Sequence, residues 1–244
     1  PRDIESLLGA SSLARVTFTL QRGDETPDLG KLSVIIDELT TAWIERVHEA
    51  AVVRLGESAA SALMARVGDS PPDNFRAAVS PDTAVGDLDR LVRLVDGEYS
   101  VLSALIHELD ANPDEWRMRV YRRDEPEALS VLLPMLANLG LTVLDEHPYE
   151  FDIDGTALYL YDIGVRIPSS VVVDEQRHRV VRSAFDGLLT GTLESDGFNR
   201  LVLLAGVSAQ RVNILRVYSK YAHQIGFTFS QGYIEATFAR LPDL

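Results

Sequence analysis

The chain has 244 residues, of which 46% are hydrophobic, and a formal net charge of −14. It contains no cysteine, which excludes disulfides, thiolate zinc sites and cysteine nucleophiles. Residues 1–173 hold fifteen basic and thirty acidic side chains, which argues against nucleic acid or anionic membrane as a partner, because binding to phosphate needs clustered Lys and Arg.

The first 67 residues predict one strand followed by helices. Apolar and threonine residues alternate over 14–20, as in a strand, and no earlier segment offers an evident partner. Apolar residues at helical spacing then predict a long helix from about residue 32 to 55, with Trp43 in its core stripe, and a second helix over 57–67. The start at Pro1 without methionine, together with the unpartnered strand, favours an excised fragment.

Residues 68–97 predict a linker followed by a helix. Pro71-Pro72 marks the linker, and Ser80-Pro81-Asp82 is a typical helix start, with a cap, a proline at the first position and an acid in the first turn. An apolar stripe from Val85 to Val95 completes this helix.

Residues 98–173 predict a sheet of about four strands with a helix on it. Strands are expected over 99–109 and from Trp116, where apolar residues alternate with polar ones as in a strand with one buried face. Leucines at helical spacing over 129–139 predict the helix, capped by Ser130 and ended by Gly140.

The hairpin that follows is the clearest local signal. Asp154-Gly155 favours a type I′ turn, which pairs Ile153 with Thr156 and, further back, Phe151 with Leu158 and Tyr149 with Leu160. We expect this apolar face to cover the leucine-rich helix. The opposite face, with Glu150, Asp152, Tyr159 and Tyr161, is expected to be at most partly buried and free to meet another module or subunit.

Residues 174–244 predict helix after helix. A first helix is expected over 177–189, and Asp196, Ser208 and Ser230 can cap three more. The third helix is expected to place one apolar stripe on a single side: Val212, Leu215, Tyr218, Tyr221, Ala222 and Ile225. The near balance of eight basic and seven acidic residues here fits a surface that packs against protein.

No motif for a catalytic site emerges. The glycine-rich phosphate loops are missing, and neither His48-Glu49 nor His107-Glu108 continues as the H-E-x-x-H of a zinc helix. Weaker candidates have commoner structural explanations: an acidic group (Asp145, Glu146 and Glu150), two histidines (His147 and His223) and an arginine cluster around His178 (Arg177, Arg179 and Arg182).

The sequence predicts neither a signal peptide nor a membrane-spanning helix. Asp3 and Glu5 stand where a signal peptide would be basic. The longest charge-free run, residues 128–144, is interrupted by a proline and a glycine and is shorter than the roughly twenty apolar residues of a spanning helix. We therefore expect a soluble, cytoplasmic protein without a membrane partner.

Several long stretches resemble the large bacterial NAD-specific glutamate dehydrogenase. The resemblance extends from about residue 80 to the end and rests on these stretches: VYRR at 120–123, LSVLLPMLANLGL at 129–141, EHPYE at 146–150, SDGFNRLVLLAGVS at 195–208, LRVYSKY at 215–221 and QIGFTFSQGYI at 224–234.

The resemblance implies a fold and a domain plan. That enzyme is several times longer and has a regulatory half with ACT-like modules and helical connectors, followed by a catalytic half. The implied fold is α+β, an ACT-like antiparallel sheet with packed helices followed by an all-helical segment. Residues 1–67 would be the remnant of a preceding ACT-like module, 68–97 a linker and helix, 98–173 the ACT-like domain, and 174–244 helices leading toward catalysis.

The same resemblance implies a regulatory or assembly segment that is catalytically silent alone. We assign no catalytic, cofactor-binding or metal residue, and NAD is expected only in the parent enzyme. Expected partners are other modules of that enzyme, a further copy in a homo-oligomer, and an amino-acid effector. The loop 122–127 lacks the glycine that amino-acid-binding ACT domains commonly have, which argues against the effector. The alternatives are a stand-alone amino-acid sensor and, more remotely, a hydrolase or transferase using the acidic hairpin.

Overall fold

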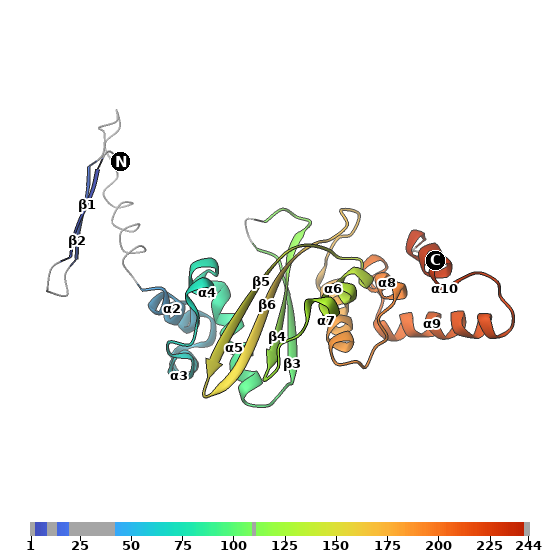
Figure 1. Ribbon diagram of the computed structural model, residues 1–244, viewed down its shortest axis with the longest axis horizontal. Coiled ribbons are helices and arrows are strands. Elements are labelled where there is room, and N and C mark those ends of the chain that lie inside the picture. The colour runs from blue at the N-terminus through green and yellow to red at the C-terminus, as the bar shows by residue number, and fades with distance from the viewer. Residues whose placement is uncertain (1–2, 9–13, 20–41, 109–110, 242–244) are drawn as a thin grey trace. The chain divides into compact units, whose positions relative to one another are not determined.

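The structure, a computed structural model, describes residues 3–8, 14–19, 42–108 and 111–241 (Figure 1). The chain divides into two compact units, residues 1–45 and 46–244. In the first, β1 (Asp3–Leu8) pairs antiparallel with β2 (Ala14–Thr19). The predicted strand is confirmed, but the expectation that it lacks a partner is wrong. The polar residues of β1 are untypical of a strand, so its sequence does not predict one. Pairing with β1 provides hydrogen-bond partners for backbone N–H and C=O groups of β2.

In the described part of the chain, four helices precede the sheet. They are α2 (Trp43–Leu55), α3 (Glu57–Val67), α4 (Asp73–Ala78) and α5 (Pro81–Val95). Gly56 separates α2 from α3 with a φ of 85°, a backbone conformation that glycine adopts without strain. The Ser80 side chain accepts the Thr83 amide and caps α5, as predicted. The helix α4 was not predicted, and the part of the expected long helix before residue 42 lies outside the described residues.

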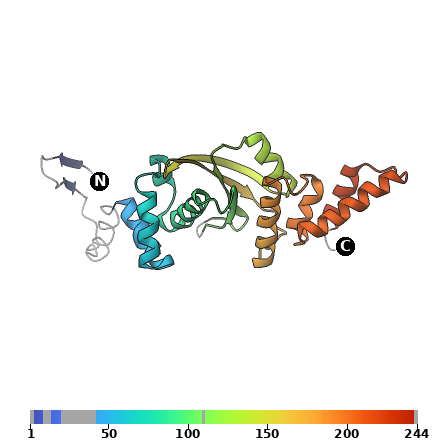
Figure 2. The same ribbon diagram turned by 90° about the horizontal axis from the view of Figure 1, so that it is seen from below.

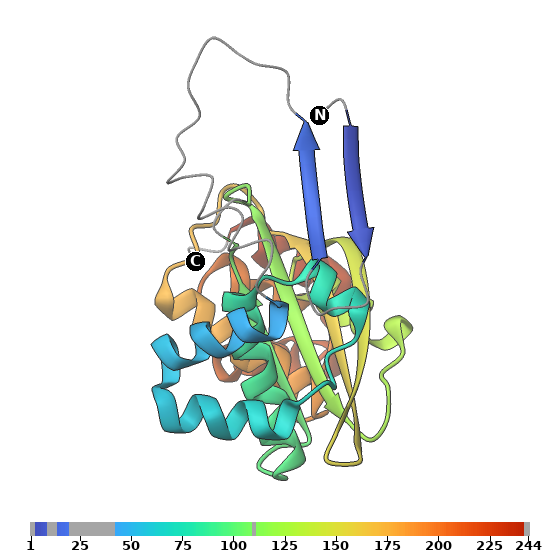
Figure 3. The same cartoon turned by 90° about the vertical axis from the view of Figure 1, so that its left-hand side faces the viewer.

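The sheet has the order β3-β4-β6-β5, and all its neighbours are antiparallel. Its strands are β3 (Val101–Ile106), β4 (Glu115–Arg123), β5 (Thr142–Ile153) and β6 (Thr156–Arg166). Figure 3 shows the yellow β5–β6 hairpin beside β4. The predicted register is confirmed, because Ile153 faces Thr156 and Tyr149 faces Leu160.

Helix α6 (Leu129–Asn138) connects β4 to β5. The prediction that Ser130 caps it is wrong, because Ala128 occupies the capping position. Pro134 lies inside the helix. The amide of Glu127 donates to the Tyr161 hydroxyl at 2.8 Å, a tertiary contact just before the helix start that the local sequence does not reveal.

Both faces of the sheet are buried, but the predicted assignment of the helix to a face is wrong. The face with Tyr149 and Phe151 meets Phe75 of α4, with ring centroids 5.1 Å apart in both pairs, and α5 contacts the same side through β4. The other face, with Tyr161, shares its core with α6 and with the helix after β6. Figure 2 shows α5 and α6 on opposite sides of the sheet. Helices before and after β4 thus form two layers around it, which strand periodicity cannot foresee.

The last part is helical, as predicted: α7 (Glu175–Leu189), the short η1 (Gly197–Asn199), α8 (Arg200–Leu204), α9 (Ala209–Gln224) and α10 (Gln231–Arg240). The Asp196 and Ser230 side chains accept backbone amides as expected, whereas Ser208 stands at the cap of α9 without such a bond. Among the described residues, no helix is long and apolar enough to cross a bilayer.

The predicted apolar stripe of α9 does not lie on a single side, because Val212 and Leu215 pack in the core while other members face outward. Val212 is buried, but Tyr218, Tyr221 and Ile225 are 57–69% exposed. Arg216 takes the inward position instead, because its guanidinium binds the Asp196 carboxylate at 2.6 and 2.9 Å.

Candidate functional site

A buried ionic cluster joins α5 to the centre of the sheet. Arg119 of β4 is 1% exposed and binds Asp87 of α5, which is fully buried. The second Nη of Arg119 lies 3.1 Å from the Asp162 carboxylate of β6. The Tyr121 hydroxyl donates to the other oxygen of Asp87 at 2.6 Å. A helix and two strands therefore meet at one guanidinium.

Arg117 extends this cluster toward solvent. Its Nε donates to Asp162 at 2.7 Å, and its Nη1 donates to Asp145 of β5, also at 2.7 Å. Gly164 makes room for this pair, because an added Cβ would lie 2.7 Å from the Asp145 carboxylate and 2.9 Å from Arg117. The network thus crosses β4, β6 and β5 in register.

Burial and ion pairing have opposing effects on the pKa values of the cluster. Burial raises the pKa of Asp87, and the Arg119 guanidinium and the Tyr121 hydroxyl oppose that rise. Burial disfavours the charge on Arg119, yet the carboxylates of Asp87 and Asp162 outweigh burial and raise the pKa of Arg119. Burial also raises the pKa of Tyr121. Such a cluster orients a helix on a sheet. Only its outer end, at Arg117 and Asp145, borders a small cavity of about 120 Å³ among the described residues.

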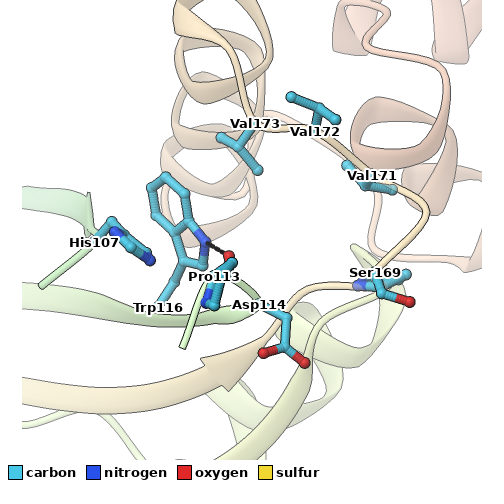
Figure 4. A pocket seen from close by; sticks show the side chains of 9 residues that line it. His107, Pro113, Asp114, Trp116, Ser169, Val171, Val172 and Val173 are labelled. Atoms are coloured by element: carbon cyan, nitrogen blue, oxygen red, sulfur yellow. Dashed lines mark hydrogen bonds between the residues drawn. The ribbon is translucent and has the colours of Figure 1, made fainter. Parts of the chain in front are cut away.

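The second candidate is a groove beside Trp116 with a volume of about 500 Å³ (Figure 4). The indole lies beside the His107 ring, with centroids 4.8 Å apart, and its Nε1 donates to the Pro113 carbonyl at 3.2 Å. Valines after β6 form the opposite wall: Val171, Val172 and Val173. One carboxylate, Asp114, lies at the edge, 3.5 Å from Arg166. The groove can hold an apolar side chain or a ring.

The candidates from sequence do not form a site together. The arginine cluster is dispersed: Arg177 donates to the carbonyls of Val172 and Leu204, whereas Arg179 lies 3.6 Å from Glu175. The Nε2 of His178 bonds the Leu105 carbonyl at 2.7 Å. The described residues contain no group of three or more His, Asp or Glu side chains that could hold a metal.

In the acidic group, burial raises the pKa of Glu146, and Asp145 is engaged by Arg117. His147 lies 3.6 Å from Asp145 at the surface, and His223 is exposed near the end of α9.

Sequence reasoning missed the ionic cluster. Arg119 and Tyr121 alternate with apolar residues in β4, and such a pattern is typical of a solvent-facing side. The available signal was two acidic residues inside apolar patterns, with a charge opposite to that of Arg119: Asp87 within the stripe of α5 and Asp162 within the run of β6.

Comparison with known proteins gives three consecutive family matches. Residues 50–94 match glutamate dehydrogenase helical motif 2, residues 101–178 match its ACT3 domain, and residues 193–244 match its helical motif 3. The chain belongs to the glutamate dehydrogenase family. The resemblance seen in the sequence is confirmed, and so is the α+β fold with an ACT-like sheet and following helices.

Relatives named NAD-specific glutamate dehydrogenase agree along most of the chain. The one from Halomonas elongata is 32% identical over 99% of this chain, that from Pseudomonas aeruginosa 32% over 92%, and that from Mycobacterium tuberculosis 30% over 87%. The chain spans only 15%, 14% and 13% of their respective lengths.

These matches give the ionic cluster a place in the family's organisation. Asp87 lies in glutamate dehydrogenase helical motif 2, and Arg119 and Asp162 lie in the ACT3 domain. In this chain, the buried charges therefore join the region that matches helical motif 2 to the region that matches the ACT3 domain.

Proposed function

We propose that this chain is a regulatory and assembly segment of an NAD-specific glutamate dehydrogenase and performs no reaction itself. The parent enzyme would oxidise L-glutamate with NAD to 2-oxoglutarate and ammonia, with NAD bound outside these residues. The observation that carries the proposal is the order of the three family matches, which run through the chain as helical motif, ACT3 domain and helical motif.

The packing supports a role in connection. Both faces of the ACT3 sheet are filled by helices of the same chain, one through the ionic cluster and one through the leucines of α6. In a sheet covered in this way, a displacement of one helical layer is passed on to the other, because packed interiors deform little. We propose that residues 46–97 and 174–244 are those layers, with the ACT-like domain between them, and that residues 1–45 belong to a preceding module.

The partners and location follow from the same role. We propose a cytoplasmic homo-oligomer in which this segment meets other modules of its own enzyme. The excess of acidic residues before residue 174 weighs against nucleic acid as a partner.

An amino-acid sensor is the second candidate, and the Trp116 groove is the observation in its favour. The loop between β4 and α6 speaks against it, because its ends are already engaged: Arg122 pairs with Glu127 at 3.2 Å, and the Glu127 amide binds Tyr161. Asp124 in this loop has a φ of 67°, a left-handed conformation reached without glycine.

Isothermal titration calorimetry with the common L-amino acids separates the two functions. An assembly segment should give only heats of dilution. A sensor should give a saturable heat that the variant Trp116→Ala loses and the variant Trp43→Ala retains. Saturable binding that depends on Trp116 would overturn the assembly proposal in favour of the sensor.

A further inference from the structure

An apolar surface on α9, the loop to α10 and the first turn of α10 has no covering element among the described residues. We call it the aromatic ridge; its members are Ile214, Val217, Tyr218, Tyr221, Ile225, Phe227, Phe229 and Tyr233. Their exposed fractions range from 47% to 69%. The Phe229 ring stacks on Tyr233 at a centroid distance of 4.8 Å, and Phe227 lies tilted against Phe229 at 5.2 Å, so this end of the ridge is preformed.

The ridge is large enough to be one side of a stable interface. Eight half-exposed side chains leave on the order of 800 Å² uncovered, since a buried aromatic ring covers about 150–250 Å². The largest apolar patch of a typical monomer is about 300–600 Å². A standard protein interface buries about 800 Å² on each partner, which the ridge matches.

The surroundings of the ridge hold few charges, of which Arg211, exposed one turn before Ile214, is one. No Asp or Glu occurs between Gly197 and Ile234. Lys220 is held by Glu194 at 2.7 Å, and Arg216 is buried against Asp196. The core of a protein interface is typically depleted of charged residues and enriched in Tyr and Phe, and the ridge shares both features.

The spacing suits a pair of identical helices. Ile214, Tyr218, Tyr221 and Ile225 follow one another at intervals of four, three and four residues, the pattern of a helix seam. In a two-fold pair the same patch meets itself, so an antiparallel arrangement would place Tyr218 close to the axis and Ile214 against the later seam residues of the other copy. Antiparallel helices also oppose their dipoles favourably.

We propose that the aromatic ridge is the surface through which two copies of this chain associate, with α9 antiparallel to α9 of the second copy. This deepens the assembly role proposed above and rests on it for its biological meaning. The inward side of α9 is unavailable for this contact, because Val212, Arg216 and Ser219 are buried within the chain.

Sedimentation of the purified chain at micromolar to near-millimolar concentrations tests the proposal. The chain should form a dimer, and the double variant Tyr218→Glu/Tyr221→Glu should associate at least about tenfold more weakly, since it buries two charges in the interface core. The matched control is Val53→Glu, which changes an apolar residue that is 90% exposed on α2 and should leave the dimer intact. Circular dichroism checks that each variant folds, and Tyr218→Ser replaces the double variant if it does not.

The absence of native cysteine allows a second, geometric test. The variant Tyr218→Cys should form a disulfide-linked dimer on mild oxidation, because residues near a two-fold axis approach within the few ångströms that a disulfide requires. Val53→Cys should form it far more slowly.

A chain that stays monomeric overturns the proposal and assigns the ridge to another part of the enzyme. A dimer insensitive to the ridge substitutions also overturns it, because association then uses another face. Neither result bears on whether the chain turns over glutamate, so failure of this inference is distinct from failure of the proposed function.

Discussion

The substitution Arg119→Met removes the central charge of the ionic cluster and keeps a long apolar stem. It leaves Asp87, which is fully buried, without its guanidinium, whereas Asp162, which is 5% exposed, keeps its pair with Arg117 at 2.7 Å. Removing one partner of a buried ion pair costs about 3–5 kcal/mol, because the remaining charge stays desolvated and unpaired. We expect the variant to lose that much free energy of unfolding.

The matched control is Arg66→Met. Arg66 also binds two aspartates, Asp96 at 2.7 Å and Asp154 at 2.9 Å, but its side chain is 30% exposed. Exposed ion pairs contribute only about 0–1 kcal/mol. In urea unfolding followed by circular dichroism and tryptophan fluorescence, Arg119→Met should lower the midpoint by about 1–2 M, given a denaturant slope of about 2–3 kcal/mol per M, and Arg66→Met should lower it much less.

The double variant Arg119→Met/Asp87→Asn identifies the cause of the loss. Asn at position 87 carries no charge, so the pair of substitutions should cost less than the sum of the two single costs. The reasoning is refuted if Arg119→Met costs no more than Arg66→Met, or if the two single costs simply add.

Three further substitutions test other parts of the fold. Phe75→Ala should cost about 3–5 kcal/mol in the same urea assay, because its fully buried ring packs edge-on against Tyr149 and Phe151. Val53→Ala at the surface should cost less than about 0.5 kcal/mol, and equal costs would contradict this packing. Gly164→Ala should destabilise the chain, since the new methyl displaces the Arg117–Asp145 pair, and Gly232→Ala, which meets nothing within 4 Å, serves as its control; similar costs would show that the pair is dispensable. Burial raises the pKa of Asp186, so the folded chain holds this proton more tightly than the unfolded chain does; the resulting stability is fully present below the unfolded pKa of about 3.9 and is lost as pH rises through the folded pKa. Unfolding free energies between about pH 3.5 and 8 should therefore show the advantage of the native chain over Asp186→Asn falling with pH, and an advantage that grows with pH would be incompatible with a buried carboxyl.

Local chemistry made the hairpin and the helix ends predictable. Asp154-Gly155 determines the register of β5 and β6, because a two-residue turn leaves one way to pair the flanking strands. The caps at Ser80, Asp196 and Ser230 likewise act within a few residues.

Tertiary choices were not predictable from one sequence. Alternation shows that a strand has two sides but not which helix covers each, so α6 was placed on the wrong face. The same limit hid the ionic cluster, since Arg119 is indistinguishable from a solvent-facing arginine until Asp87 of α5 lies over it. In α9, Arg216 faces inward because it pairs with the Asp196 carboxylate. Tyr218 and Tyr221 therefore lie on the outer side of the helix.

We propose that these residues connect and assemble a glutamate dehydrogenase without performing its reaction. The most direct measurement is the absorbance of NADH formed when the purified chain is mixed with L-glutamate and NAD. We predict no formation above the protein-free control at any concentration of the chain. NADH formation that requires glutamate and scales with the amount of chain would contradict the account.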